Sequence, residues 1–144
     1  MASGLEAFSK GRPRKRGSSP KLILWNNALI NAQSLRSFND VQRDPSWRGR
    51  LVENAVGAKL LNELQGFPWS INYWRDGNDE VDFVVSHGNS HFAIEVKSGR
   101  TGKPTGISAF RAAYPGSSTI LIGEGGIPLT EFFDTNSEDW FTGG

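Results

Sequence analysis

The alternation of apolar and polar residues is clearest from Asp79 to Gly99, DEVDFVVSHGNSHFAIEVKSG. A period of two is typical of β-strands, so the stretch predicts two strands with one apolar face. Gly88-Asn89 suits a two-residue hairpin turn, because glycine readily takes the positive φ that such a turn requires. We therefore expect a hairpin. Its apolar positions are Val81, Phe83, Val85, Phe92, Ile94 and Val96, of which Val81, Phe83, Ile94 and Val96 are expected to be buried on one face.

The hairpin turn also predicts which polar residues lie opposite one another. With Gly88 and Asn89 as the loop, Asp82 faces Glu95 and Glu80 faces Lys97 on the other face of the sheet. Opposed residues have Cβ atoms about 4.5–5.5 Å apart, at which distance two carboxylates repel each other unless a positive charge lies between them. Mg²⁺ is typically held by one or two carboxylates. The alternative is an amphipathic hairpin whose polar side only faces solvent, and the sequence pattern leaves both open.

A helix is predicted from about residue 46 to residue 65, ended by Gly66 and Pro68. Apolar residues occur almost all round it, so we expect it to be well buried. Glu53 falls on an apolar side of this helix, where a carboxylate has to be paired, protonated or bound to a metal. The alternatives are a salt bridge from Glu53 to Arg50 or to another basic residue, and a slight error in the phase of the helix.

Shorter elements complete one α/β domain. We expect a strand or helix start at 21–25, a strand at 70–74, a helix at 107–114, a strand at 119–122 and a helical segment at 128–133. The predicted division is a basic flexible arm over residues 1–20, the folded domain over 21–134 and a polar tail over 135–144. In that tail Trp140 and Phe141 are candidates for aromatic contacts with a partner.

Composition excludes some chemistry and adds a candidate partner. The 144 residues include no cysteine, which excludes disulfides and thiol chemistry. Ten Lys/Arg against three Asp/Glu give residues 1–50 a charge of +7, whereas six against twelve give 51–144 a charge of −6. The basic half suits an anionic partner such as DNA, although the arm is equally readable as a linker. The candidate nucleic-acid-binding residues are Lys10, Arg12, Arg14, Lys15 and Arg16, with Arg100 and Lys103 near the hairpin.

The chain is expected to be a soluble, cytoplasmic protein that does not associate with a membrane. No apolar run approaches the ~20 residues of a membrane span. Met1-Ala2-Ser3-Gly4 does not begin a signal peptide.

The order of acidic and basic motifs resembles the PD-(D/E)XK nuclease superfamily. That motif has an acidic residue on the first helix, an Asp on the second strand and E-x-K on the third, matched here by Glu53, Asp82 and Glu95-Val96-Lys97. Val81 stands where the superfamily name has proline, and the short gap between Asp82 and Glu95 is like that of archaeal Holliday junction resolvases. The resemblance implies a restriction-endonuclease-like core, a mixed β-sheet flanked by helices.

A closer resemblance covers nearly the whole chain. The blocks SSPKLILW, GRLVENAVGAKLL, WRDGNDEVDFVV, FAIEVKSG and IGEGGIPLTEFF are similar to a C-terminal domain of unknown function. That domain is found behind the ATPase module of prokaryotic AAA+ ATPases and is regarded as PD-(D/E)XK-like. Because this chain has neither Walker motif, the resemblance implies that it is only the C-terminal piece, with the ATPase module as its partner.

Two functions follow from these resemblances. The first is a Mg²⁺- or Mn²⁺-dependent DNA endonuclease in which Asp82 and Glu95 hold the metal and Glu53 completes or orients its ligands. Lys97 would then position the attacking water or stabilise the charge that develops on the phosphate. The second is a non-catalytic module that uses the same scaffold to bind nucleic acid or the ATPase module.

Overall fold

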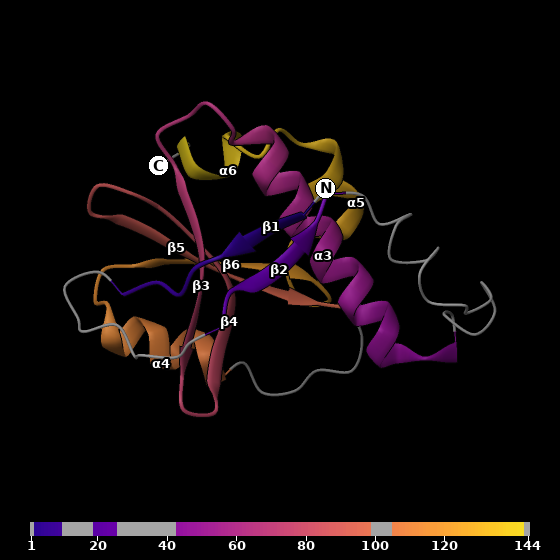
Figure 1. Ribbon diagram of the computed structural model, residues 1–144, viewed down its shortest axis with the longest axis horizontal. Helices are drawn as coiled ribbons and strands as arrows, with labels where there is room; N and C mark the ends of the chain where they lie inside the picture. The colour runs from indigo at the N-terminus through magenta and orange to yellow at the C-terminus, as the bar shows by residue number, and fades with distance from the viewer. Residues whose placement is uncertain (1, 10–18, 26–42, 99–104, 143–144) are drawn as a thin grey trace.

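The computed structural model describes residues 2–9, 19–25, 43–98 and 105–142 (Figure 1). It is a mixed α/β domain in which a four-stranded sheet is flanked by helices and accompanied by a small two-stranded sheet. The elements are β1 (Ala2–Leu5), β2 (Lys21–Leu24), α3 (Pro45–Glu63), β3 (Ser70–Asp76), β4 (Asp79–His87), β5 (Ser90–Lys97), α4 (Thr105–Ala113), β6 (Ser118–Gly123), α5 (Leu129–Asp134) and α6 (Asp139–Thr142).

The four-stranded sheet has the order β3-β4-β5-β6, with β5–β6 parallel and the other pairs antiparallel. The predicted hairpin register is confirmed from His87, opposite Ser90, to Phe83, opposite Ile94. Gly88 has a φ of +59°, as the predicted turn requires. The turn chemistry therefore fixed the pairing of β4 with β5 correctly.

A register shift in the β3–β4 pair changes the alternation at Asp82. On β3, Asn72 lies opposite Val84 but Trp74 lies opposite Val81. Two residues of β4, Asp82 and Phe83, therefore oppose the single β3 residue Tyr73. Such a bulge inserts an extra residue and moves side chains from one face to the other. The expectation that Val81 shares a buried face with Phe83 was therefore wrong, because Val81 packs with Val84 in the cluster beneath α4.

Each face of the sheet packs against its own helix. Figure 1 shows α3 beside the small β1–β2 sheet, with α4 across the four strands from it. The α3 side forms the larger core, which includes Val56, Leu60, Phe83, Val85, Ile94, Ile122 and Phe132. The α4 side is a smaller core of Phe8, Trp74, Val81, Val84, Ala93 and Phe110. The face of the hairpin that carries Val84 and Ala93 is thus covered rather than open to solvent.

Helix α3 begins and packs for identifiable reasons. The side chain of Asp44 caps it by accepting a hydrogen bond from the backbone N–H of Trp47, and Pro45 occupies the first turn, where no N–H is needed. Gly57 lets the helix approach the sheet, since a Cβ there would lie 2.9 Å from the ring of Phe83. This close approach brings the helix turn carrying Glu53 toward β4.

The structure corrects the predicted arm and tail where it describes them. Strand β1 pairs with β2, and Leu5 and Phe8 are buried in the core, so residues 2–9 belong to the fold rather than to a flexible arm. In the predicted tail, α6 is helical and Phe141 is only 7% exposed. Phe141 therefore packs inside the domain and is not a partner-facing aromatic. No helix within the described ranges is long and apolar enough to cross a membrane.

Candidate functional site

Asp82 is held against strand β5 by its own side chain. Just beyond the last regular pair of the β4–β5 ladder, Asp82 Oδ2 accepts a hydrogen bond of 2.9 Å from the backbone N–H of Val96. Val96 lies between Glu95 and Lys97 in the sequence, so this bond places the Asp82 carboxylate beside the E-x-K motif. Because of the bulge and this bond, the side chain of Asp82 does not follow the regular alternation of side chains along β4.

Glu53 and Asp82 are joined by a residue that the sequence did not single out. The ammonium of Lys21 on β2 forms an ion pair with Glu53 Oε1, donates to the backbone carbonyl of Asp82 at 3.1 Å and lies 3.8 Å from Asp82 Oδ1. It also lies 4.8 Å from the centre of the Phe83 ring. Of the alternatives left open for Glu53, a salt bridge to another basic residue is therefore confirmed, with Lys21 as the partner.

Strand β2 is fixed to α3 by Asn54, the neighbour of Glu53. The Asn54 side chain accepts from the Leu24 backbone N–H at 2.8 Å and donates to the Leu24 carbonyl at 2.7 Å. Asn54 is buried, so these bonds satisfy polar groups that would otherwise be costly to desolvate. The oxygen and the nitrogen of the Asn54 amide both bond to β2, and this keeps Lys21, the first residue of β2, near Glu53.

The environment of Asp82 opposes its negative charge. Burial raises the pKa of Asp82 to about 7, and the nearby carboxylates of Glu53 and Glu95 add to the rise. Lys21 and the Val96 N–H act in the opposite direction but do not cancel it. A carboxyl group with a pKa near neutrality, set among other carboxylates, is a common feature of functional sites.

Glu95 and Lys97 form the second half of the site. Lys97 Nζ donates to Glu95 Oε1 at 2.6 Å, and Glu95 is only 9% exposed. The other oxygen, Glu95 Oε2, is buried without a hydrogen-bond partner among the described residues. A buried carboxylate oxygen without a partner is costly, which makes it a natural ligand for a cation. The regular β4–β5 pairing ends at Phe83 and Ile94, so the opposition of Glu80 and Lys97 stays a prediction; the Glu80 carboxylate forms its ion pair with Arg75 on β3, at 3.1 Å.

These residues suit a cation bound partly by protein and partly by water. Within the described ranges, no three His, Cys, Asp or Glu side chains come close enough to form a metal cage. Mg²⁺ does not need such a cage, because it usually keeps several waters and uses one or two carboxylates. Asp82 and Glu95 are the two carboxylates available for this role, and Glu53 is linked to Asp82 through Lys21. The donor set therefore fits a hard divalent cation.

The candidate DNA-binding residues lie outside the described part of the chain. They are Lys10, Arg12, Arg14, Lys15, Arg16, Arg100 and Lys103. Their role stays a prediction from the sequence.

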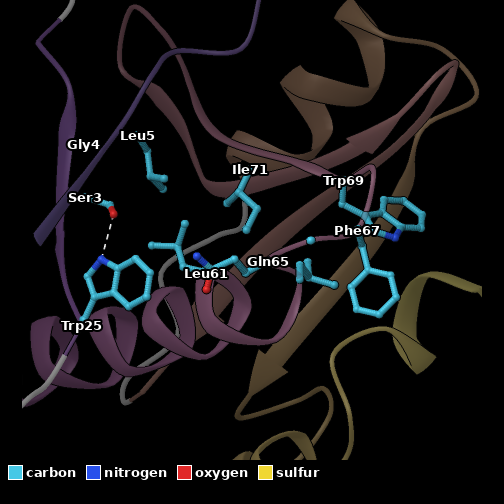
Figure 2. A pocket seen from close by; sticks show the side chains of 11 residues that line it. Ser3, Gly4, Leu5, Trp25, Leu61, Gln65, Phe67, Trp69 and Ile71 are labelled. Atoms are coloured by element: carbon cyan, nitrogen blue, oxygen red, sulfur yellow. Dashed lines mark hydrogen bonds between the residues drawn. The ribbon is translucent and has the colours of Figure 1, made fainter.

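A cavity of about 410 Å³ lies away from the charged residues, between the β1–β2 sheet and the C-terminal end of α3. Figure 2 shows Trp25 at one end of it, where the indole N–H donates to Ser3 Oγ at 2.7 Å, and Phe67 and Trp69 at the other. Its lining includes neither Asp82 nor Glu95. The cavity is thus separate from the charged site, and its lining mixes aromatic and aliphatic side chains with polar ones such as Ser3 and Gln65.

Fold and site together define the class of protein: a mixed α/β domain with a carboxylate–lysine site at the junction of β4, β5 and α3. The family model of a domain of unknown function, DUF4143, matches residues 48–130, which is more than half of the chain. The chain therefore belongs to the DUF4143 family. Neither the comparison with curated proteins nor that with solved structures gave a match.

The family match covers Glu53, Asp82, Glu95 and Lys97 but begins after Lys21. Lys21 was also not among the candidates that the sequence suggested. Its contact with Asp82 spans 61 positions, and no local periodicity connects the two residues. The one signal was its place at the start of an apolar strand within the block SSPKLILW.

Proposed function

We propose that this chain is a metal-dependent nuclease domain of the PD-(D/E)XK type, which hydrolyses phosphodiester bonds in DNA. The observation that carries the proposal is the arrangement around Val96. Its N–H fixes the Asp82 carboxylate beside Glu95, whose buried Oε2 has no partner in the described part of the chain. Lys97 extends from the same strand and contacts Glu95. A carboxylate pair with an adjacent lysine is the combination that the resemblance to PD-(D/E)XK nucleases assigns to phosphodiester hydrolysis.

Asp82 and Glu95 would hold Mg²⁺ or Mn²⁺, with Glu53 completing or orienting the ligand set. When bound, such an ion polarises a phosphoryl oxygen and lowers the pKa of a bound water. The protein would supply a negative, partly buried site in which the pKa of Asp82, about 7, lets this carboxylate ionise at neutral to alkaline pH. Cation binding by Asp82 would therefore strengthen as the pH rises through 7.

Lys97 would act on the reacting phosphate or on the attacking water. Its ammonium is 2.6 Å from Glu95 Oε1 and so is held at the edge of the proposed cation site. A fixed positive charge there would stabilise the negative charge that develops on the phosphate oxygens. Removal of one such donor typically lowers the rate by ~10²–10³.

The proposal also covers the setting of the domain. The five blocks shared with the C-terminal domain of prokaryotic AAA+ ATPases support an N-terminal ATPase module as partner and a cytoplasmic location. The basic residues near positions 10–16 and 100–103 would contribute contacts with DNA phosphates.

One observation favours a second function, a non-catalytic module that binds nucleic acid or the ATPase module. Each carboxylate already has a lysine near it, with Lys21 on Glu53 and Asp82, and Lys97 on Glu95. In this reading the charges stabilise the fold and need no cation.

A nicking assay on supercoiled and branched DNA, run with Mg²⁺ or Mn²⁺, separates the two functions. The nuclease proposal predicts cleavage by the wild type and loss of cleavage in Asp82→Asn and Glu95→Gln. Glu80→Gln is the matched control, because Glu80 is a β4 carboxylate paired with Arg75 outside the site. A wild type that cuts with neither metal, and gains no thermal stability from either, would support the non-catalytic module.

A further inference from the structure

We propose that Lys21 is the internal counter-cation of the acidic site and that a divalent cation must displace it from Glu53 to bind. This inference rests on the proposed metal site but assigns a residue outside the E-x-K motif and outside the family match. Lys21 would thereby set how tightly the site binds metal. It is a positioning residue, because it acts through the carboxylates.

The first support is the position of the ammonium. Lys21 Nζ pairs with Glu53 Oε1 and lies 3.8 Å from Asp82 Oδ1, so one positive charge sits between the two carboxylates that α3 and β4 contribute. The side chain is only 17% exposed, so solvent screens this charge less than it would on the open surface. A divalent ion that uses both carboxylates would have to occupy the same region.

The second support is the way in which Lys21 is held there. One of its three N–H groups donates to the backbone carbonyl of Asp82, beside the bulge that separates Asp82 from the regular β3–β4 ladder. Its ammonium also lies over the ring of Phe83, and Asn54 fixes strand β2 to α3. Lys21 is thus anchored through neutral partners. It can give up Glu53 while its bond to the Asp82 carbonyl persists.

The third support is the contrast with Glu95. Lys97 contacts Glu95 Oε1, whereas Oε2 has no hydrogen-bond partner in the described ranges. The site therefore has one carboxylate oxygen ready for a cation and, at Glu53 and Asp82, oxygens that already face the ammonium of Lys21. Competition at the second position, rather than a lack of ligands, would limit metal affinity.

The test measures Mn²⁺ affinity by isothermal titration calorimetry at pH 8, above the pKa of Asp82 of about 7. The variant is Lys21→Gln, whose amide keeps N–H donors but carries no charge. We expect Mn²⁺ to bind Lys21→Gln about tenfold more tightly than the wild type, because a unit charge a few ångströms from the ligands is removed. Lys21→Arg, which keeps the charge, should bind Mn²⁺ about as the wild type does.

Lys59→Gln is the matched control. Lys59 is also a partly buried lysine paired with a carboxylate, Glu63 on α3, and lies 5.9 Å from the ring centre of Phe132. The same charge is lost, but outside the site, so Mn²⁺ affinity should stay at the wild-type value. Lys21→Met, which keeps an apolar stem next to Phe83, replaces Lys21→Gln if circular dichroism shows that the glutamine variant is unfolded.

The outcomes separate the two proposals. If the wild type binds Mn²⁺ and the uncharged Lys21 variants bind it equally or more weakly, the role of Lys21 is overturned while the metal site stands. If neither the wild type nor the uncharged variants bind Mn²⁺, the metal site and the role of Lys21 both fall. If Lys59→Gln binds Mn²⁺ more tightly to the same extent, the effect comes from net charge alone, and the specific role of Lys21 is overturned.

Discussion

The backbone N–H of Val96 donates to Asp82 Oδ2 across the β4–β5 pair at 2.9 Å. This bond ties the aspartate to the middle residue of the E-x-K motif, so the position of one motif depends on the other. It also keeps a partly buried carboxylate in place although burial and the neighbouring carboxylates disfavour its charge. Stability and the proposed activity are therefore expected to respond oppositely to changes at Asp82.

Asp82→Asn should stabilise the protein at alkaline pH. The pKa of Asp82 is about 7 in the fold, above its ordinary value of about 4, because of burial and then of Glu53. Its contribution to stability is thus fully present below pH ~4 and is lost as the pH rises through about 7. Asparagine stays neutral and can still accept from Val96. At pH 8 we expect the variant to be more stable by on the order of 1–3 kcal/mol.

The measurement is urea unfolding of wild type and Asp82→Asn without divalent metal, from pH 4 to pH 8. The difference in unfolding free energy should be smallest at pH 4 and largest at pH 8. An Asp82→Asn variant that loses stability as the pH rises to 8, relative to the wild type, would contradict the described environment of Asp82.

Lys97→Ala should destabilise the fold more than loss of an exposed ion pair does. Lys97 is the hydrogen-bond partner of Glu95 Oε1, and Oε2 has none among the described residues, so the variant leaves a buried charge uncompensated. We expect a loss of roughly 2–4 kcal/mol by thermal or urea unfolding. Arg75→Ala, which breaks the exposed pair with Glu80, should cost about 0–1 kcal/mol.

A second substitution tests the cause of that loss. Adding Glu95→Gln to Lys97→Ala removes the uncompensated charge and should restore most of the stability. If the double variant is as unstable as Lys97→Ala, the loss comes from packing of the lysine stem and not from the buried carboxylate.

Gly57→Ala should move α3 away from the sheet. The new Cβ would lie 2.9 Å from the ring of Phe83, a residue with no exposed surface. Overpacking of this kind costs about 1–3 kcal/mol, against a gain of up to about 1 kcal/mol from the better helix propensity of alanine. We expect a net loss of stability in urea unfolding.

Gly49→Ala on the same helix is the control for that prediction. There the new Cβ would lie 3.1 Å from the hydroxyl of Ser98, which can rotate away. The propensity gain should then prevail. Equal stabilisation of both variants would mean that Gly57 does not set the distance between α3 and β4.

The sequence predicted those features of the structure that depend on residues close together in the chain. The Gly88-Asn89 turn and the alternation on both sides of it fixed the β4–β5 register, because a tight turn admits few pairings. The bulge at Asp82 and Phe83 was not visible, since it depends on how β3 pairs with β4. Periodicity therefore placed Val81 on the wrong face.

The site showed the same division. Asp82, Glu95 and Lys97 were grouped as candidates from the sequence because one hairpin brings them together. Lys21 was not, because β2 reaches Glu53 and Asp82 only through tertiary packing and the Asn54 hydrogen bonds. The short strand β1 was missed for a similar reason. A basic run without apolar alternation separates it in the sequence from β2, the strand with which it pairs.

The basic run from Lys10 to Arg16 should contribute non-specific affinity for DNA. It carries five basic residues, and each duplex phosphate contact adds about 0.9 to the slope of log affinity against log salt. Neutralising all five by glutamine should therefore flatten that slope and weaken binding. Binding to a fluorescent duplex over a range of KCl concentrations measures it. An unchanged slope would leave the run as a linker.

The most direct test of the account is the anomalous scattering of Mn²⁺ soaked into crystals of the protein at pH 8. The account predicts one strong peak in contact with a carboxylate oxygen of Asp82 and with Glu95 Oε2, with Lys21 moved away from Glu53. Asp82→Asn crystals treated in the same way should lack the peak. No peak between Asp82 and Glu95 at saturating Mn²⁺, with the Lys21–Glu53 ion pair intact, would contradict the metal site and the nuclease proposal that depends on it.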